Sequence, residues 1–166
     1  MNIIVAVSNN WCIGKDNELL QPIHRDLKRF KQFTTGNIII CGRTTYESFP
    51  KRPLPDRLNI VVTSNKNYGD ENIKAVSGID ELRKELKNYD TNKLWVVGGE
   101  SIYRQLIDYS EKAYITVINT SKEGNKYFPD LEKLENWKKI SSSDIYEEDS
   151  ISFRYDEYIN TSVKPL

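Results

Sequence analysis

The chain has 166 residues, carries no formal net charge, and is 38% hydrophobic and 11% aromatic. This length suits one compact domain spanning residues 1–166, and the aromatic content disfavours disorder. Since 24 Lys and Arg balance 24 Asp and Glu, and no apolar run approaches the roughly 18 residues of a membrane span, we expect neither a nucleic-acid nor a membrane partner.

The first ten residues, MNIIVAVSNN, have no positive charge before their apolar stretch and predict a buried strand rather than a signal peptide. Cys12 and Cys41 form no CxxC motif, and His24 is the single histidine of the sequence. A Cys/His metal site is therefore not expected. The sparse cysteines indicate a reduced, cytoplasmic protein.

Apolar β-branched runs alternate with helical patterns along the chain. The predicted strands are 3–7, 38–41, 58–62, 94–97 and 114–118. The predicted helices are 25–34, a short one within 42–48 that Thr44 and Glu47 would cap, one starting at Ser77, and one from 100 to 106. Two alternating runs, 140–146 and 151–159, predict an antiparallel hairpin. The pattern predicts an α/β fold with a mostly parallel central sheet and helices on both faces.

Ligands of such sheets bind beyond the carboxyl ends of the strands. Gly98-Gly99 follows a strand there and permits close approach of a phosphate, although a plain tight turn explains the pair equally well. Arg43 and Ser64 follow two further strands, where a solvated arginine and an ordinary loop are the alternatives. Together the three strand ends would suit a dinucleotide with an extra phosphate.

Asp26 lies near the start of a helix whose apolar stripe contains Leu27, Phe30 and Phe33. It could complement the helix dipole, or it could face a ligand that offers two parallel N–H groups. Arg57 follows a proline-stiffened loop and is either a surface residue or a carboxylate clamp. His24 is expected to be exposed to solvent.

These segments resemble the dihydrofolate reductase family along most of the chain, from Ile3 to about Tyr158. The resemblance rests on the order of its motifs: IIVAVS, IG followed by N, D-L-x-x-F-K-x-x-T, GRTTYES, RPLPxR, NIVVTS, VVGGxxIY, YIT and EGNKYFP. It implies reduction of 7,8-dihydrofolate to tetrahydrofolate with NADPH, and inhibition by antifolates. We expect a monomer.

The resemblance also implies residue roles. Asp26 would bind the pteridine edge and promote protonation at N5, and Arg57 would pair with the glutamate α-carboxylate. The other implied substrate contacts are Val5, Ala6, Leu27, Phe30, Val97 and Thr116. The implied cofactor contacts are Ala6, Ile13, Gly14, Leu19, Gly42, Arg43, Thr44, Thr45, Thr63, Ser64, Gly98, Gly99, Glu100, Ser101 and Tyr103. A cis peptide is expected between Gly98 and Gly99.

Four positions depart from the family pattern. Leu20 and Gln21 stand where a proline and a tryptophan are usual. His24 stands where a proline is usual, and Asn125 where an aspartate is frequent. Two alternative functions therefore stay open at this point: an NADPH reductase domain of the riboflavin pathway, and a nucleotide-binding module without catalysis.

Overall fold

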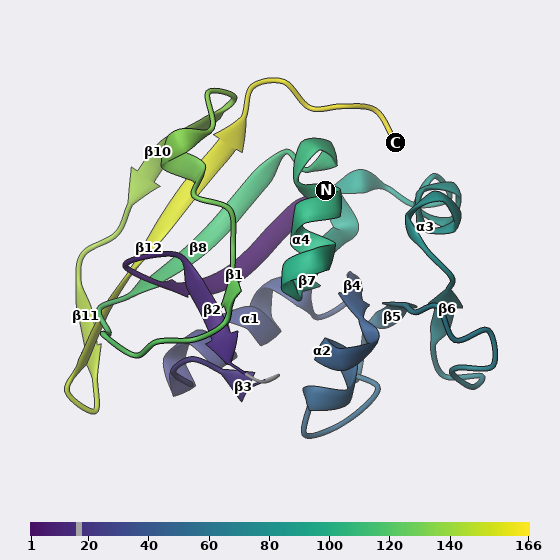
Figure 1. The fold of residues 1–166 in the computed structure, drawn as a ribbon, viewed down its shortest axis with the longest axis horizontal. Coiled ribbons are helices and arrows are strands. Elements are labelled where there is room, and N and C mark those ends of the chain that lie inside the picture. The colour runs from purple at the N-terminus through teal and green to yellow at the C-terminus, as the bar shows by residue number, and fades with distance from the viewer. Residues whose placement is uncertain (16–17) are drawn as a thin grey trace.

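The computed structural model describes residues 1–15 and 18–166, and within them β-branched and aromatic segments pair into a nine-stranded sheet. Six neighbouring strands run parallel, and the antiparallel strands follow at one edge (Figure 1). The parallel strands, in spatial order, are β8 (Lys112–Ile118), β1 (Asn2–Ser8), β7 (Leu94–Gly98), β4 (Ile38–Gly42), β5 (Leu58–Val62) and β6 (Lys74–Val76). The antiparallel strands are β12 (Ile151–Asn160), β10 (Trp137–Ser142) and β11 (Tyr146–Glu148). The predicted parallel sheet and terminal hairpin are confirmed.

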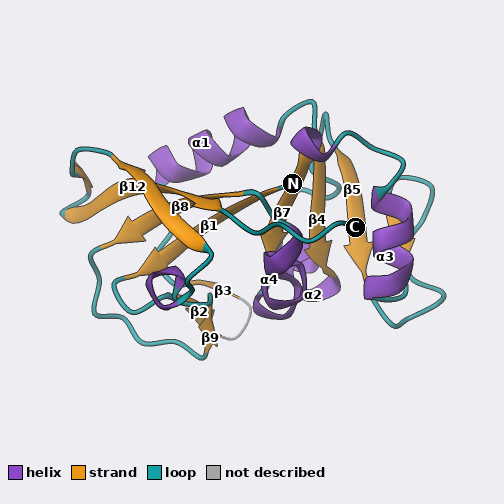
Figure 2. Ribbon diagram, turned by 90° about the horizontal axis from the view of Figure 1, so that it is seen from above, coloured by secondary structure: helices purple, strands orange, loops and turns teal. Residues whose placement is uncertain are grey.

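Helices cover both faces of this sheet, as predicted (Figure 2). One face carries α1 (His24–Thr34), while α2 (Arg43–Ser48) and α4 (Glu100–Leu106) lie on the other; α3 (Ile79–Leu86) lies near β5 and β6. The 3-10 turns are η1 (Thr91–Lys93), η2 (Ile107–Tyr109) and η3 (Leu131–Lys133). The main core includes Ile3, Val96, Leu106 and Ile115, all buried. Under α1, Phe33 packs against Trp95 and Tyr114, with ring centroids 5.6 and 5.2 Å away.

A second, three-stranded sheet of β3 (Glu18–Leu19), β2 (Cys12–Lys15) and β9 (Lys126–Tyr127) lies beside the α4 face. Its short strands carry no alternating pattern, so the sequence did not predict them. Gly124 is required there, because an added Cβ would come within 2.2 Å of the Gly14 carbonyl oxygen. The Asn125 backbone N–H donates to that same oxygen at 3.0 Å, so backbone contacts join the two loops. Asn17, the last residue of the second family motif, lies outside the described residues.

One predicted helix cap and one predicted helix start are wrong. The helix α2 begins at Arg43 after Gly42, with no side-chain cap, so Thr44 and Glu47 form no capping box. The helix α3 begins at Ile79 after Gly78, and Ser77 instead donates from its backbone and hydroxyl to Glu81 Oε2 at 2.6 and 2.5 Å. In both places a glycine takes the cap position one or two residues away from the hydroxyl side chain.

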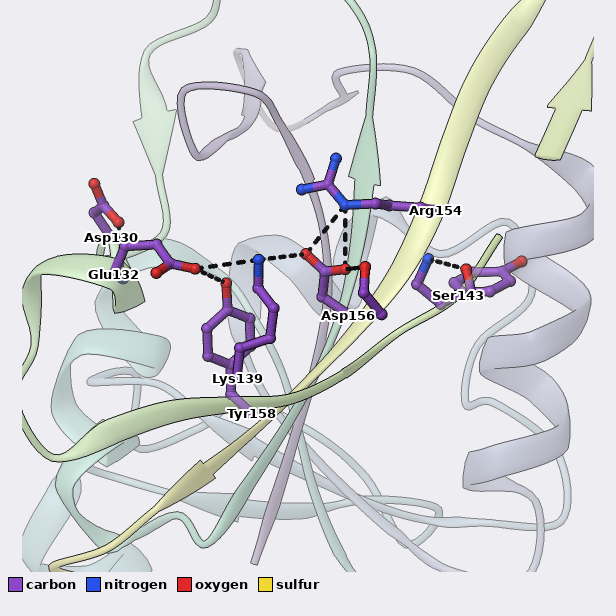
Figure 3. A network of polar contacts seen from close by, with 9 residues as sticks. Asp130, Glu132, Lys139, Ser143, Arg154, Asp156 and Tyr158 are labelled. Atoms are coloured by element: carbon purple, nitrogen blue, oxygen red, sulfur yellow. Dashed lines mark hydrogen bonds and ion pairs between the residues drawn. The ribbon is translucent and has the colours of Figure 1, made fainter. Parts of the chain in front are cut away.

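The edge near β10 holds a polar network on the sheet face opposite α1 (Figure 3). Asp156 of β12 is 1% exposed and accepts hydrogen bonds from Ser142 at 2.5 Å and from Arg154 at 3.1 Å. Lys139 of β10 lies 3.5 Å from Asp156 and 3.3 Å from Glu132 of η3. This network therefore joins β10, β12 and η3 through charge-assisted contacts.

Candidate active site

The neighbouring strands β1 and β7 separate toward their carboxyl ends. Their ladder pairs Asn2 with Trp95 and Ile3 with Val96 and extends no further, although β1 continues to Ser8. The first β1 carbonyl beyond the ladder, that of Ile4, accepts a hydrogen bond of 2.8 Å from the buried Tyr103 hydroxyl of α4. The chain reverses its crossover direction around this point, which is where open α/β sheets bind ligands.

Asp26 projects from the first turn of α1 onto the neighbouring strand β8. Its Oδ1 accepts a hydrogen bond of 2.5 Å from the hydroxyl of Thr116, which pairs with Ala6 in β1 and Tyr155 in β12. The side chain is half-buried. Asp26 therefore lies beside the apolar residues of its helix, as the sequence predicted. The hydrogen bond from Thr116 was not predicted.

Burial raises the pKa of Asp26 above its usual value of 3.8. The Thr116 hydrogen bond and the Arg29 charge oppose this rise in pKa, whereas the negative charge of Glu148 adds to it. A carboxyl group held in this way retains its proton more readily than one in water. Such a group is a candidate for proton chemistry.

The apolar residues beside Asp26 stay accessible. Leu27 is 46% exposed, and Phe30 is half-buried on the same helix. Arg57 lies 6.0 Å from the Phe30 ring centroid, and its Nη1 and Nε donate to Thr34 and to the Pro55 carbonyl, each at 2.9 Å. These bonds orient the guanidinium group beside Phe30. The predicted aromatic wall and carboxylate clamp therefore lie together.

The predicted phosphate-binding residues meet at the carboxyl ends of β4, β5 and β7. Gly42 pairs with Val62, and Cys41 pairs with both Val61 and Gly98. The residues that follow these strands therefore lie side by side. They are Arg43, Thr44 and Thr45 after β4, Thr63 and Ser64 after β5, and Gly99, Glu100 and Ser101 after β7.

The glycine pair lies at the closest approach between these elements. A Cβ on Gly99 would meet the Thr45 hydroxyl at 3.1 Å, and one on Gly98, whose φ is +114°, would meet the Tyr103 ring at 3.0 Å. The Gly98–Gly99 peptide is cis, which confirms the expectation from the resemblance. Arg43 is exposed at this edge. A cavity of about 270 Å³ follows the ends of β5 and β6 and is lined by Thr63, Asn65, Lys66, Ala75, Val76, Ser77 and Glu81.

The remaining predicted positions surround the two clusters. Ile13 and Gly14 lie in β2, and Gly14 pairs with Leu19 of β3. Val97 is half-buried near the end of β7. Val5 belongs to the main core, so its side chain lies on the face away from Thr116.

The sequence interpretation missed four residues of this neighbourhood. They are Ile4, Arg29, Glu148 and Tyr155, which contribute a backbone carbonyl, two charges and an aromatic ring. A signal for Ile4 existed, because it directly precedes the predicted contacts Val5 and Ala6 in the strand. A signal for Arg29 existed too, because it follows Asp26 by three residues on the same helix. Glu148 had none, because its contact with the helix start joins residues far apart in sequence.

Comparisons with known proteins agree with this geometry. The family model described as dihydrofolate reductase matches residues 1–160. The dihydrofolate reductase of Bacillus subtilis (strain 168) is 35% identical over 156 residues, covering 94% of this chain and 90% of that protein. That of Buchnera aphidicola subsp. Baizongia pistaciae (strain Bp) is 38% identical over 148 residues, covering 89% and 87%.

A solved structure is similar over almost the whole fold. It is the dihydrofolate reductase from Enterococcus faecalis complexed with NADP(H) and RAB-propyl, with a TM-score of 0.85 and 29% sequence identity. The matched region covers 96% of this chain and 95% of the solved chain.

The fold and the comparisons define an α/β oxidoreductase, with Asp26 in one cluster and the loops that follow β4, β5 and β7 in the other. The chain belongs to the dihydrofolate reductase family. Its activity is the NADPH-dependent dihydrofolate reductase activity of that family.

Proposed function

We propose that Asp26 assists protonation at N5 of 7,8-dihydrofolate while C6 is reduced to give 5,6,7,8-tetrahydrofolate. The observation that carries this proposal is the half-buried Asp26 carboxyl, whose pKa is raised by burial beside the gap between β1 and β7. Protonation of N5 makes C6 a better hydride acceptor. A nearby carboxylate stabilises the protonated imine, because an opposite charge raises the proton affinity of the ligand.

The proposed substrate site uses residues on both sides of Asp26. The carboxylate would accept two parallel N–H bonds from the pteridine, as Asp26 retains acceptor positions beyond the Thr116 hydrogen bond. Leu27 and Phe30 would pack against the rings, and Arg57 would pair with the glutamate α-carboxylate. The set is completed by Val5, Ala6, Val97 and Thr116.

The residues at the strand ends fit NADPH. Two glycines that lack room for a Cβ allow close approach, and the exposed Arg43 with neighbouring hydroxyls offers donors for phosphates. The proposed phosphate ligands are Arg43, Thr44, Thr45, Thr63 and Ser64. The proposed wall consists of Ala6, Ile13, Gly14, Leu19, Gly42, Gly98, Gly99, Glu100, Ser101 and Tyr103. NADPH supplies the hydride when it is bound. The protein residues would hold NADPH and exclude water from it.

The test of the reaction is NADPH oxidation with and without dihydrofolate. Substrate-dependent oxidation supports the proposal. Turnover of a riboflavin-pathway pyrimidine instead would favour the first alternative, and binding without turnover would favour the second.

The test of the cofactor contacts is Arg43→Ala. We expect KM for NADPH to rise about 10- to 100-fold, because a charge-assisted contact to the extra phosphate is lost. KM for NADH should change much less. The control is Lys51→Ala, which removes an exposed cation from the loop after α2. Equal losses with both cofactors would contradict the assignment.

We also propose that antifolates pair with Asp26 and that the protein is a cytoplasmic monomer. Both cysteines are buried and unpaired, which supports a reducing compartment. No helix within residues 1–15 and 18–166 is long and apolar enough to cross a membrane. Light scattering of the purified protein tests the monomer, and inhibitor titration of Asp26→Asn tests the pairing.

A further inference from the structure

The helix that carries Asp26 begins without a cap of its own. Its N-cap residue is Ile23, whose side chain cannot accept a hydrogen bond, and no side-chain cap bond forms there. The first backbone N–H groups of a helix have no partner within the helix and need an acceptor from elsewhere.

That acceptor comes from Glu148, at the end of β11. The His24 N–H donates to Glu148 Oε2 at 2.7 Å, and the Arg25 N–H donates to Oε1 at 3.0 Å. Both carboxylate oxygens are therefore engaged, and the negative charge lies at the positive end of the helix dipole. A proline at position 24 would have no N–H, so the departure of His24 from the family pattern makes the first bond possible.

Aromatic contacts support the same docking. The Arg25 guanidinium carbon lies 3.8 Å from the ring centroid of Tyr146, two residues before Glu148 in β11. Tyr146 packs on Phe153 at 6.0 Å, and Phe153 is buried with Ile23 at the helix start. The hairpin of β11 and β12 thus contacts the first turn of α1 through aromatic side chains and through the Glu148 carboxylate.

Asp26 is the next residue after Arg25, so the position of this turn determines where the acid lies relative to Thr116. The charged groups that act on Asp26 are Arg29 of α1 and Glu148 of β11. Two tyrosines face it from further elements, because the negative charge of Asp26 contributes to the raised pKa of Tyr155 of β12 and of Tyr103 of α4. Arg29 lies over the Tyr155 ring at 3.8 Å, with its Nη1 buried.

We propose that Glu148 is a positioning residue for Asp26, which clamps the first turn of α1 to the terminal hairpin and adds a negative charge beside the acid. The proposal rests on the function proposed for Asp26. Removal of the Glu148 charge lowers the pKa of Asp26, because the repulsion of its ionised form is relieved.

Glu148→Gln tests the charge, because glutamine keeps one oxygen acceptor. We expect the titration of Asp26, followed by NMR of ¹³C-labelled aspartate in the protein without ligands, to move to lower pH. The negative charge of Glu148 also favours a proton on N5 of the bound substrate, so its loss should lower the proton affinity of N5. We therefore expect the pH profile of kcat to move to lower pH, so that kcat at pH 7 falls about two- to fivefold. Glu148→Ala, which also loses both hydrogen bonds, should lower kcat at pH 7 about tenfold.

Glu147→Gln is the matched control, since Glu147 is an exposed neighbour in the same strand. It should leave both the titration and the profile in place. An Asp26 titration that is unchanged in Glu148→Gln, or that moves equally in Glu147→Gln, would overturn the role of Glu148. A shifted titration with an unchanged kcat profile would instead overturn the role of Asp26, so the two failures are distinguishable.

Discussion

Two carboxylates on opposite faces of the sheet, the buried Asp156 and the half-buried Asp26, have opposite surroundings. Asp156 is 1% exposed and contacts Ser142, Arg154 and Lys139, so its charge is matched by two cations (Figure 3). Asp26 accepts one side-chain hydrogen bond, from Thr116, within the described part of the chain. Its surroundings include a cation and a second carboxylate, and burial raises its pKa.

This difference supports the role in the reaction that we propose for Asp26. A buried carboxylate with matched partners holds elements together, because every removed partner leaves a charge uncompensated. A carboxyl group with acceptor positions left over and a raised pKa can bind a ligand and exchange a proton. The more deeply buried acid of this protein is thus the structural one.

The largest expected effect is on activity. Asp26→Asn should reduce kcat at pH 7 about 100- to 1000-fold, because the charge that favours a protonated substrate is lost. Activity should partly recover in acid, where the substrate arrives protonated. Asp156→Asn, the matched change on the other face, should keep kcat within about twofold. Steady-state NADPH oxidation from pH 5 to 9 measures kcat of both variants. Similar losses of kcat in the two variants would contradict the distinction between a catalytic Asp26 and a structural Asp156.

The second effect is on stability, where we expect the change at Asp156 to matter more than the change at Asp26. Asp156→Asn should lower the free energy of unfolding by about 2 kcal/mol, since Arg154 and Lys139 lose their shared partner but remain about one-third exposed. Urea denaturation at pH 7 measures the loss. Glu135→Gln serves as the control, because Glu135 is exposed and lies between Glu132 and Lys139 in the sequence. No change in the urea midpoint would mean that the network contributes no net stability.

A third, smaller effect sharpens the account of Asp26. Thr116→Val removes the hydrogen bond that favours the ionised carboxylate, so the pKa of Asp26 should rise further. The ¹³C titration of Asp26 should therefore move to higher pH, opposite to the shift expected for Glu148→Gln. Thr91→Val, which changes an exposed threonine of η1, should leave the titration of Asp26 unchanged. A shift to lower pH would contradict the assignment of the hydrogen bond.

The smallest effect concerns the stability cost of the acid itself. Because the folded-state pKa of Asp26 lies above its ordinary value of 3.8, the native state binds this proton more tightly than the unfolded state. The stability that Asp26 contributes is present below pH 3.8 and is lost as the pH rises through the folded-state pKa. Asp26→Asn should thus become more stable than the natural chain as the pH rises. Urea midpoints measured from pH 4 to 8 would contradict this if their difference stayed constant.

Much of the fold follows from local sequence. The runs at 38–41 and 58–62 are β-branched and apolar, which suits strands covered on both faces, and they form β4 and β5. The strand of three residues, β6, was not predicted, because a segment that short has no measurable period. The capping box at Thr44 was predicted wrongly and the helix start at Ile79 was missed, since in both places a glycine holds the cap position near a hydroxyl residue.

The sequence by itself determined the main strands, the helix with Asp26 on its apolar stripe, and the loops after the strands for which we propose anion binding, because these depend on neighbours within a few residues. Tertiary structure alone decided the long-range partners of Asp26 and of its helix. Thr116 lies 90 residues from Asp26, and Glu148 lies 124 residues from the helix start that it caps. A hydrogen bond depends on distance and direction in space, and spacing along the chain carries neither once a sheet has brought distant strands together.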